Sequence, residues 1–465
     1  MNLRLPGLTV PANPLDGYPL MARREPEVAQ IVSTTHDGRG IADLSGKKVF
    51  VAGALAGEEV RFLRRKIRRK FDEAELLEVL QASPSRIEPR CEAFGRCGGC
   101  SLQHVSDEEQ RELKQTSLRD ALERIGGVAP ERWLAPIFVD GQDGSWNYRR
   151  RARLAVKDVH GKGRVLVGFR ERHAPFVTDM HRCEVLAAPV GELIDPLSKL
   201  IDGLSIRSRV PQIEVGIGDN VAELIFRVLD PPTEDDCKLL TEFAKQHALR
   251  VSLQPGGLDS VTALYPLERP EPLSYELPEY DVTIEFEATD FVQINGLVNR
   301  LMVSSAIDLL EVDSDHRVLD LFCGIGNFTL PLARRAGGVT GIEGELRQVV
   351  RGRSNATLNK IGNAEFLQAD LVEISGKEPW IKSGCDRLLL DPARSGALEV
   401  IKHIKTLAPD RIVYVSCHPG TLARDAAELV GTGRYSLVAA GIIDMFPHTA
   451  HVESIACFAR TKKNK

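Results

Sequence analysis

The sequence predicts a chain of three parts: a small N-terminal β-barrel, a central α+β domain, and a C-terminal α/β domain built on a doubly wound parallel sheet. Its 465 residues exceed what one hydrophobic core usually spans. Short β-type runs broken by turns fill residues 27–80, which is typical of a small barrel. From about residue 284, apolar strands alternate with helices, and this pattern predicts a parallel sheet covered on both faces.

Changes in the residue pattern along the chain set the expected domain boundaries. Residues 1–24 are interpreted as a loose leader without function, and the barrel is expected over 25–82. The central domain is expected over 83–283 and the C-terminal domain over 284–465. No run approaches the roughly 18 apolar residues of a membrane span, and the N-terminus lacks a basic-then-apolar signal pattern. We therefore expect a cytoplasmic protein that does not contact a membrane.

Two helices are expected in the central part. Ser106 and Glu109 form a capping box ahead of a helix over about 106–126, which is a candidate to pack on the C-terminal domain. Its apolar face is predicted to be Leu118, Leu122 and Ile125. The strand-rich region that follows is expected to contain one further helix, near 234–247.

Positive charge is concentrated locally although the net charge is -5. Two basic blocks stand out, RFLRRKIRRK at 61–70 and NYRRRAR at 147–153. The first block places seven cations in ten residues, more than a charge-guarded strand edge requires. We favour RNA contact for this block and keep the solvated strand edge as the alternative.

Nine cysteines, an odd number in a long chain without a signal sequence, argue against a disulfide framework. The stretch CEAFGRCGGC groups three of them within residues 91–100. Most isolated cysteines serve as core filler. That interpretation is adopted for Cys237, Cys323, Cys385 and Cys457.

A cofactor site is predicted at RVLDLFCGIGNF, where an apolar strand (318–322) runs into a turn containing Gly324 and Gly326. The next strand ends in Glu343, whose carboxylate can bind the two hydroxyls of a ribose. The missing third glycine and the acidic surroundings favour S-adenosylmethionine over a dinucleotide, because no pyrophosphate has to be cradled. An ordinary strand-to-helix turn and an NAD site are the alternatives.

Two further strands end in reactive residues. RLLLD leads to Asp391 and RIVYVSC leads to Cys417. Ligands of open parallel sheets bind beyond the carboxyl ends of the strands, so these residues should meet Glu343 and Asp370 at one edge. The Cys417 thiolate is suited to attack carbon 6 of a pyrimidine, which prepares carbon 5 for a methyl group.

A base must then remove the carbon 5 proton. DMFPHTAHVES offers His448, His451 and Glu453, and the residues alone do not choose among them, although the two histidines read more naturally as loop residues.

Several motifs together resemble the RNA 5-methyluridine methyltransferases, in particular the bacterial members that modify 23S ribosomal RNA. They are FVQIN (291–295), DLFCGIGNF (320–328), GIE (341–343), DPAR (391–394), YVSCHPGTLARD (414–425) and DMFPHTAHVE (444–453). The resemblance implies Cys417 as nucleophile, Glu453 as base, Asp391 as a contact of the uracil edge and Phe291 as a stacking partner of the flipped base. The cofactor contacts implied are Gln293, Phe322, Asn327, Glu343, Asp370 and Asp391. His418 stands where the family usually has asparagine.

The resemblance also gives the N-terminal half a role. It implies that the barrel is an OB-like TRAM domain that binds RNA, and that the C-terminal domain is Rossmann-like. It further implies a [4Fe-4S] cluster with the ligands Cys91, Cys97, Cys100 and Cys183. Four thiolates would also suit zinc, and nearby glycine amides at 95, 98 and 99 favour iron. The expected partner is 23S ribosomal RNA, met by a monomer.

Rival readings remain open for the substrate and for the class. The same chemistry on transfer RNA or on two ribosomal sites is one alternative, and a nonenzymatic iron–sulfur RNA-binding protein is another. A radical methylthiotransferase would need a C-x3-C-x2-C motif, whereas Cys91, Cys97 and Cys100 have the spacing C-x5-C-x2-C.

Overall fold

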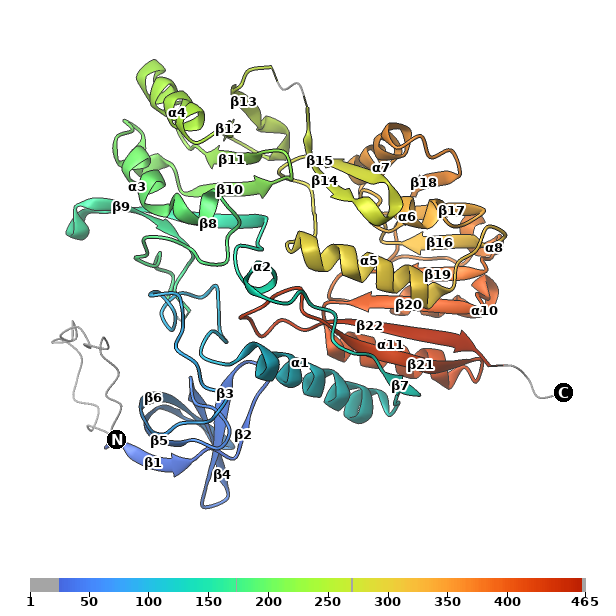
Figure 1. Cartoon of the computed structure of the whole chain (residues 1–465), viewed down its shortest axis with the longest axis horizontal. Helices are drawn as coiled ribbons and strands as arrows, with labels where there is room; N and C mark the ends of the chain where they lie inside the picture. The colour runs from blue at the N-terminus through green and yellow to red at the C-terminus, as the bar shows by residue number, and fades with distance from the viewer. Residues whose placement is uncertain (1–24, 173, 269–270, 462–465) are drawn as a thin grey trace.

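The computed structural model describes residues 25–172, 174–268 and 271–461 (Figure 1). The predicted leader, 1–24, lies outside these residues. Four sheets form three successive parts of the chain, which confirms the multidomain prediction. Within the described residues, no helix is long and apolar enough to cross a bilayer.

The N-terminal part is a curled, barrel-like sheet with the strand order β1-β5-β6-β4-β3-β2. One face encloses a small core that includes Val49, Val51, Val60 and Phe62. The alternation of buried and exposed residues along these strands explains why their sequences predicted β structure. The strands are β1 (Glu27–Gln30), β2 (Ser33–Thr34), β3 (Arg39–Leu44), β4 (Lys47–Ala52), β5 (Glu59–Ile67) and β6 (Phe71–Gln81).

The basic block 61–70 runs along β5 and into its turn, and much of its charge is neutralised across the hairpin. Arg61 pairs with Glu78, Arg65 with Glu75, and Lys66 and Arg68 both pair with Glu73; Arg64 bridges Glu27 and the fully buried Asp72. Arg69 and Lys70 are exposed and have no ion pair within the described part of the chain. Most cations of this block are therefore paired with carboxylates of the neighbouring strands, and the two without an ion pair among the described residues lie in the turn.

The central part is a mixed sheet with the order β13-β12-β11-β10-β8-β9, in which only β11 and β12 are parallel. The helix α4 (Glu234–Gln246) connects that parallel pair and agrees with the predicted helix. The expectation of a single helix here is wrong, because α3 (Ile194–Asp202) packs beside it. Its nine residues, with a proline in the first turn, are too few to give a clear helical period. The strands are β8 (Arg151–Val159), β9 (Arg164–Gly168), β10 (Gln212–Ile217), β11 (Ala222–Arg227), β12 (Leu249–Gln254) and β13 (Thr262–Tyr265).

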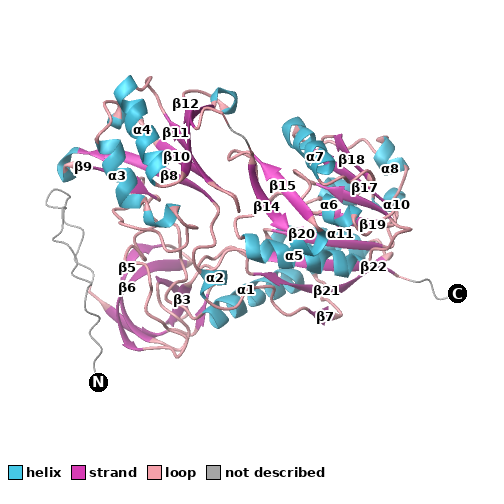
Figure 2. Cartoon of the chain, turned by 45° about the horizontal axis from the view of Figure 1, so that its top comes forward, coloured by secondary structure: helices cyan, strands magenta, loops and turns pink. Residues whose placement is uncertain are grey.

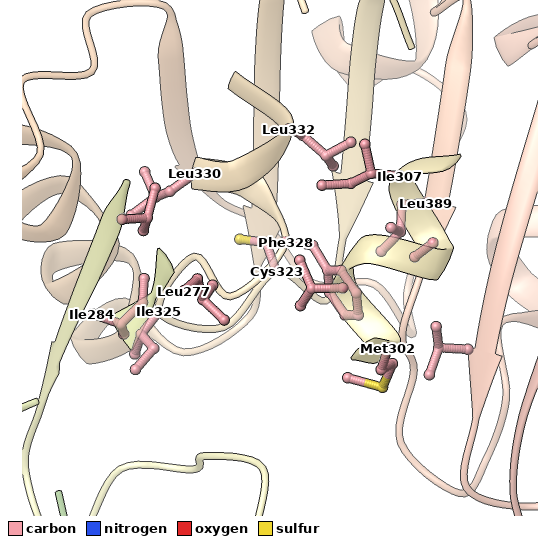
Figure 3. Packing of buried hydrophobic residues seen from close by; sticks show 14 of the residues in the cluster. Leu277, Ile284, Met302, Ile307, Cys323, Ile325, Phe328, Leu330, Leu332 and Leu389 are labelled. Atoms are coloured by element: carbon pink, nitrogen blue, oxygen red, sulfur yellow. The ribbon is translucent and has the colours of Figure 1, made fainter. Parts of the chain in front are cut away.

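A two-stranded hairpin, β14 (Leu273–Leu277) and β15 (Val282–Phe286), lies between the central and C-terminal sheets in both views (Figures 1 and 2). The boundary expected between residues 283 and 284 falls within β15 of this hairpin. Its apolar residues share one core with α5 (Gly296–Leu310) and with the loop and helix that follow β16 (Figure 3). Leu277 and Ile284 of the hairpin belong to the same cluster as Met302 and Phe328.

The C-terminal part is an eight-stranded sheet with the order β18-β17-β16-β19-β20-β22-β21-β7. The first five strands are parallel, as predicted, and β22 and β21 extend the sheet in antiparallel fashion. The strands are β16 (Arg317–Leu321), β17 (Gly338–Glu343), β18 (Ala364–Gln368), β19 (Arg387–Leu390), β20 (Arg411–Ser416), β21 (Tyr435–Ile443), β22 (Glu453–Arg460) and β7 (Arg132–Trp133).

Helices cover both faces of this sheet. One face packs on α5, α6 (Thr329–Ala333) and α7 (Leu346–Leu358). The other packs on α8 (Pro379–Lys382), α9 (Leu398–Ile401), α10 (Ile404–Leu407), α11 (Pro419–Gly431) and, from far earlier in the sequence, α1 (Asp107–Ala121). The short helix α2 (Gln142–Ser145) follows β7 in sequence. The layers are those of a Rossmann-like α/β domain.

The helix α1 begins after Ser106, whose hydroxyl accepts a hydrogen bond from the Glu109 amide. The predicted capping box is only half formed, because the Ser106 amide donates to the Ser85 carbonyl and the Glu109 carboxylate accepts from the Ser85 hydroxyl. Leu118 and Leu122 are fully buried against the C-terminal sheet. Ile125, predicted on the same face, is 61% exposed. The reason is a π-turn over Leu122–Gly126, which changes the angular spacing of the last residues.

Candidate active site

Strand register brings the predicted site residues to one edge of the C-terminal sheet. Leu321 lies beside Ile342 and Leu390, the last apolar positions of their strands. Leu390 lies beside Tyr414, and Ser416 lies beside Ser454. The residues at or just beyond these positions are Phe322, Glu343, Asp391 and Cys417 from the parallel strands and Glu453 from the start of β22. The convergence expected from parallel topology therefore includes one residue of an antiparallel strand.

The turn after β16 approaches the end of β17 closely. Phe322, Gly324 and Gly326 all have positive φ, and for Phe322 (φ 65°) this is a strained conformation of the kind found at functional sites. The Glu343 carboxylate accepts hydrogen bonds from the amides of Gly324 (3.0 Å) and Gly344 (2.7 Å). These contacts fix an acidic group beside the glycine turn.

The other predicted cofactor contacts differ in their surroundings. Asn327 and Asn299 exchange two amide hydrogen bonds of 2.9 Å, and Tyr275 also donates to Asn327. Gln293 is half-buried in the segment that leads into α5. Asp370 is exposed two residues beyond β18, and its carboxylate accepts from the Val372 amide at 2.7 Å. Asn299 and Tyr275 were not predicted, since no local motif relates them to Asn327.

Buried titratable groups surround Cys417. Burial, and then the neighbouring carboxyl of Glu453, raise the pKa of the Cys417 thiol to about 11. Burial and Asp391 raise the pKa of Glu453 to about 8, and burial alone raises that of Asp391 to about 7. Arg394 opposes the shifts of Cys417 and Glu453. No separate role was predicted for Arg394, although it lies in the DPAR motif.

The remaining candidates near the edge are distinguished by burial. His448 is 1% exposed and hydrogen-bonded to Gln110, as expected of a loop residue. His451 is exposed and lies 3.2 Å from a guanidinium nitrogen of Arg394. Phe291 is 64% exposed, an unusual state for a large aromatic ring and one that leaves its faces accessible. His418 begins α11, and its Nδ1 accepts from the Thr421 amide, which is the capping role an asparagine would have.

The buried carboxyls predict how stability depends on pH. Asp320, raised to a pKa of about 8 by burial, joins Asp391 and Glu453. The folded protein holds protons that the unfolded chain has released, so the free energy of unfolding should fall as pH rises from about 6.5 to about 8. Each group that is protonated in the folded protein and ionised in the unfolded chain lowers the free energy of unfolding by at most about 1.4 kcal/mol per pH unit. Buried His104 and His448, with lowered pKa values, act in the opposite direction only at lower pH.

Urea denaturation of the ligand-free protein across this range measures the slope. Asp320→Asn should make the slope shallower, because amides do not titrate. Equal slopes for the two proteins would mean that Asp320 is already ionised in the folded state.

The four cysteines predicted as ligands line one cavity in the central part. Cys91, Cys97, Cys100 and Cys183 surround it together with Phe94, Phe169, Met180 and Val185. Cys97 and Cys183 are buried, and burial raises the pKa of Cys100 to about 12. Within the described residues, no three His, Cys, Asp or Glu side chains are arranged to hold a metal ion. All four thiols border this one space.

Two details of the cysteine predictions need correction. The Gly99 amide donates to the Cys97 sulfur at 3.3 Å, whereas the Gly98 amide donates to the Arg170 carbonyl and is not available to a sulfur. Cys323, Cys385 and Cys457 are buried, as core filler should be. Cys237 is only half-buried, because α4 covers the edge of its sheet.

A doubly wound sheet with a glycine turn, an acidic end to the next strand and a half-buried cysteine at the same edge is typical of an S-adenosylmethionine-dependent methyltransferase. Residues 274–461 match the family described as tRNA (Uracil-5-)-methyltransferase. The 23S rRNA (uracil(1939)-C(5))-methyltransferase RlmD of Alkalilimnicola ehrlichii is 52% identical over 94% of this chain and 97% of its own length. The corresponding protein of Alcanivorax borkumensis is 49% identical over 95% of this chain and 100% of its own. The chain belongs to the RNA uracil-C5 methyltransferase family.

A solved structure gives the same result for the fold. The tRNA (uracil-54, C5)-methyltransferase of Pyrococcus abyssi, in complex with S-adenosyl-L-homocysteine, aligns with a TM-score of 0.69 at 25% identity. The alignment covers 93% of this chain and 100% of that protein. The similarity therefore extends through all three parts of the chain.

Proposed function

We propose that this protein methylates carbon 5 of uridine 1939 in 23S ribosomal RNA, using S-adenosylmethionine. The proposed reaction is supported by the positions of Cys417 and Glu453, which lie opposite each other at the sheet edge that also holds the glycine turn. The ribosomal target is supported by the RlmD relatives, which match nearly the whole chain. The enzyme is expected to act as a monomer.

Cys417 is the proposed nucleophile. Once deprotonated, its sulfur forms a bond to carbon 6 of the flipped uracil, and the electron pair of the carbon 5–carbon 6 double bond moves toward the ring carbonyl. S-adenosylmethionine would supply an electrophilic methyl group when bound; carbon 5 would take it as the sulfonium–methyl bond breaks and S-adenosylhomocysteine leaves. The high pKa of Cys417 means that few molecules of the free enzyme hold a thiolate at neutral pH, so Arg394 is suited to offset the neighbouring carboxyls.

Glu453 is the proposed base that removes the proton from carbon 5. The electron pair of the uracil carbon 5–hydrogen bond then restores the carbon 5–carbon 6 double bond, and the Cys417 sulfur leaves as thiolate. A pKa of about 8 suits this role, because a base works best when its pKa lies near the working pH. Asp391 is proposed to hold the uracil edge, and the exposed ring of Phe291 to stack on the flipped base.

The residues at the edge fit S-adenosylmethionine. The anchored Glu343 carboxylate can accept hydrogen bonds from the ribose hydroxyls, and the acidic surroundings suit a cationic sulfonium. Gly324 and Gly326 of the same turn have positive φ and carry no side chain, so a ligand can approach the backbone closely there. The proposed contacts are Gln293, Phe322, Asn327, Glu343, Asp370 and Asp391.

The test is to incubate the protein with radiolabelled S-adenosylmethionine and unmodified transcripts of 23S ribosomal RNA and transfer RNA, then to identify the labelled nucleoside and its position. Label in 5-methyluridine at position 1939 alone supports the proposal. Label at a second ribosomal position, or in transfer RNA, keeps the chemistry and changes the target. Absence of label in both transcripts would contradict the enzymatic proposal.

We propose that Cys91, Cys97, Cys100 and Cys183 hold a [4Fe-4S] cluster. All four thiols border one cavity, and four thiolates are the usual ligands of such a cluster. The Gly99 amide is already directed at a sulfur, as amides near clusters are. Iron and sulfide analysis of the anaerobically purified protein tests this; zinc without sulfide would overturn it.

The barrel-like sheet is proposed to be a TRAM-type RNA-binding module whose free charge lies at the β5–β6 turn. Arg64 is excluded from this role, because it pairs with buried Asp72 and its loss would weaken the sheet. The double variant Arg69→Gln/Lys70→Gln should weaken RNA binding and reduce the slope of log affinity against log salt by about one for each lost phosphate contact. Filter binding across a salt series measures the slope.

The control for this experiment is Lys238→Gln, which removes an exposed cation of α4 in the central part. Its slope should equal that of the wild type. If the double variant also keeps the wild-type slope, the β5–β6 turn does not contact RNA.

A further inference from the structure

The loop that joins β21 to β22 leads directly into Glu453. This loop, residues 444–452, is largely buried, with Asp444, Met445 and His448 each less than 5% exposed. His448 has positive φ (63°), so the chain adopts an unfavourable conformation there. Such a conformation persists only where the surroundings impose it, and the contacts that impose it come from residues more than 290 positions earlier in the sequence.

Lys114 of α1 holds the beginning of the loop. Its ammonium group donates to the Asp444 carboxylate at 2.6 Å and to the Phe446 carbonyl at 2.9 Å. The side chains of Lys114 and Asp444 are 1% and 6% exposed. A buried ion pair contributes little net stability but is costly to break, so it fixes geometry more than it adds stability.

Gln110, one turn earlier on α1, holds the middle of the loop. Its Oε1 accepts from the His448 amide at 2.7 Å, which leaves Nε2 as the donor to the Val105 carbonyl and to Nδ1 of His448. Because Nδ1 accepts, the proton of the neutral imidazole lies on Nε2. One side chain thus contacts both the backbone amide and Nδ1 of His448.

Further contacts come from the cysteine-rich segment and from the loop between α2 and β8; together with Gln110 and Lys114, these residues form what we call the clamp. The amides of Ser101 and Leu102, next to Cys100, both donate to the His448 carbonyl at 2.9 Å. The Tyr148 hydroxyl donates to the Pro447 carbonyl at 3.0 Å, and the Trp146 ring stacks on His448 with 3.9 Å between ring centroids. The segment beside the proposed cluster is therefore in direct contact with the loop that carries the proposed base.

We propose that Gln110 and Lys114 are positioning residues that hold the β21–β22 loop, and through it the Glu453 carboxylate, in place for proton removal from carbon 5. This inference rests on the proposed role of Glu453. A displacement of about 1 Å in a catalytic group can cost roughly 100-fold in rate. Loosening the clamp should therefore slow the release of methylated RNA more than it slows methyl transfer, since the latter depends on Cys417 at the end of β20.

The test compares Gln110→Ala and Lys114→Met with Thr116→Ala, an exposed position on the same helix. Single-turnover reactions measure methyl transfer by label in RNA and release by loss of the covalent protein–RNA band on a denaturing gel. We expect release to slow by about 10- to 100-fold in Gln110→Ala and Lys114→Met, with methyl transfer changed less than about threefold. S-adenosylhomocysteine affinity should be retained, and Thr116→Ala should match the wild type.

Glu453→Gln, assayed in parallel, distinguishes failure of this inference from failure of the proposed role of Glu453. If Glu453→Gln accumulates the covalent band but the two α1 variants release RNA at the wild-type rate, the clamp does not position the base. If methyl transfer, release and cofactor affinity fall together in Gln110→Ala, its role is general stability and the inference is wrong. If Glu453→Gln itself releases RNA normally, the base is another group and both proposals fail.

Discussion

Cys417→Ala is expected to abolish methylation, by at least roughly 10⁴-fold, while the affinity for S-adenosylhomocysteine changes little. The thiol is the group proposed to form the bond to carbon 6, and alanine offers no electron pair in its place. The cofactor contacts lie on other strand ends, so removing one half-buried sulfur leaves them intact. Transfer of radiolabel to the ribosomal transcript and calorimetric titration with S-adenosylhomocysteine measure the two quantities.

The control variant for Cys417 is Cys237→Ala. Cys237 is also half-buried but lies on α4 in the central part, so its loss should leave turnover unchanged. A Cys417→Ala protein that still methylates RNA would exclude the proposed nucleophile. Loss of cofactor binding together with activity would instead indicate that the alanine disturbs the sheet edge, and Cys417→Ser would then provide the milder substitution.

The parts of the site that could be predicted are those fixed by a single strand and its turn. Glu343 and Cys417 each follow an apolar run that can only be a buried strand, and parallel strands end at a common edge. The positions of these two residues at that edge can therefore be predicted from the sequence around them. The same holds for the N-cap of α1, where Ser106 and Glu109 lie within one turn.

The parts that could not be predicted depend on contacts between distant segments. Proposing Glu453 over His448 and His451 depends on the pairing of β22 with β20, which places Glu453 near Cys417, and on the packing of α1, whose Gln110 contacts His448. The ion pairs of the basic block could not be predicted, because most of its carboxylate partners lie on the paired strand β6. Ile125 was misplaced because the π-turn leaves no mark in the hydrophobic period.

Glu453→Gln is expected to trap a covalent adduct between Cys417 and methylated RNA. Glutamine has nearly the shape of glutamate, so base flipping, sulfur attack and methyl transfer should proceed. Its amide cannot accept the carbon 5 proton, and without loss of that proton the double bond cannot re-form to expel the sulfur. The adduct should appear as a slowly migrating band that survives denaturation and contains both protein and label.

His451→Gln tests the competing base. This residue is two positions before Glu453, exposed and in contact with Arg394, so it is the remaining titratable side chain of the loop that could reach the edge. Normal turnover of His451→Gln, together with a trapped adduct in Glu453→Gln, assigns the proton to Glu453. The reverse pattern assigns it to His451. If Glu453→Gln forms no adduct and methylates no RNA, the carboxylate acts at an earlier step. That step is the loss of the proton from the Cys417 thiol, whose pKa is raised to about 11.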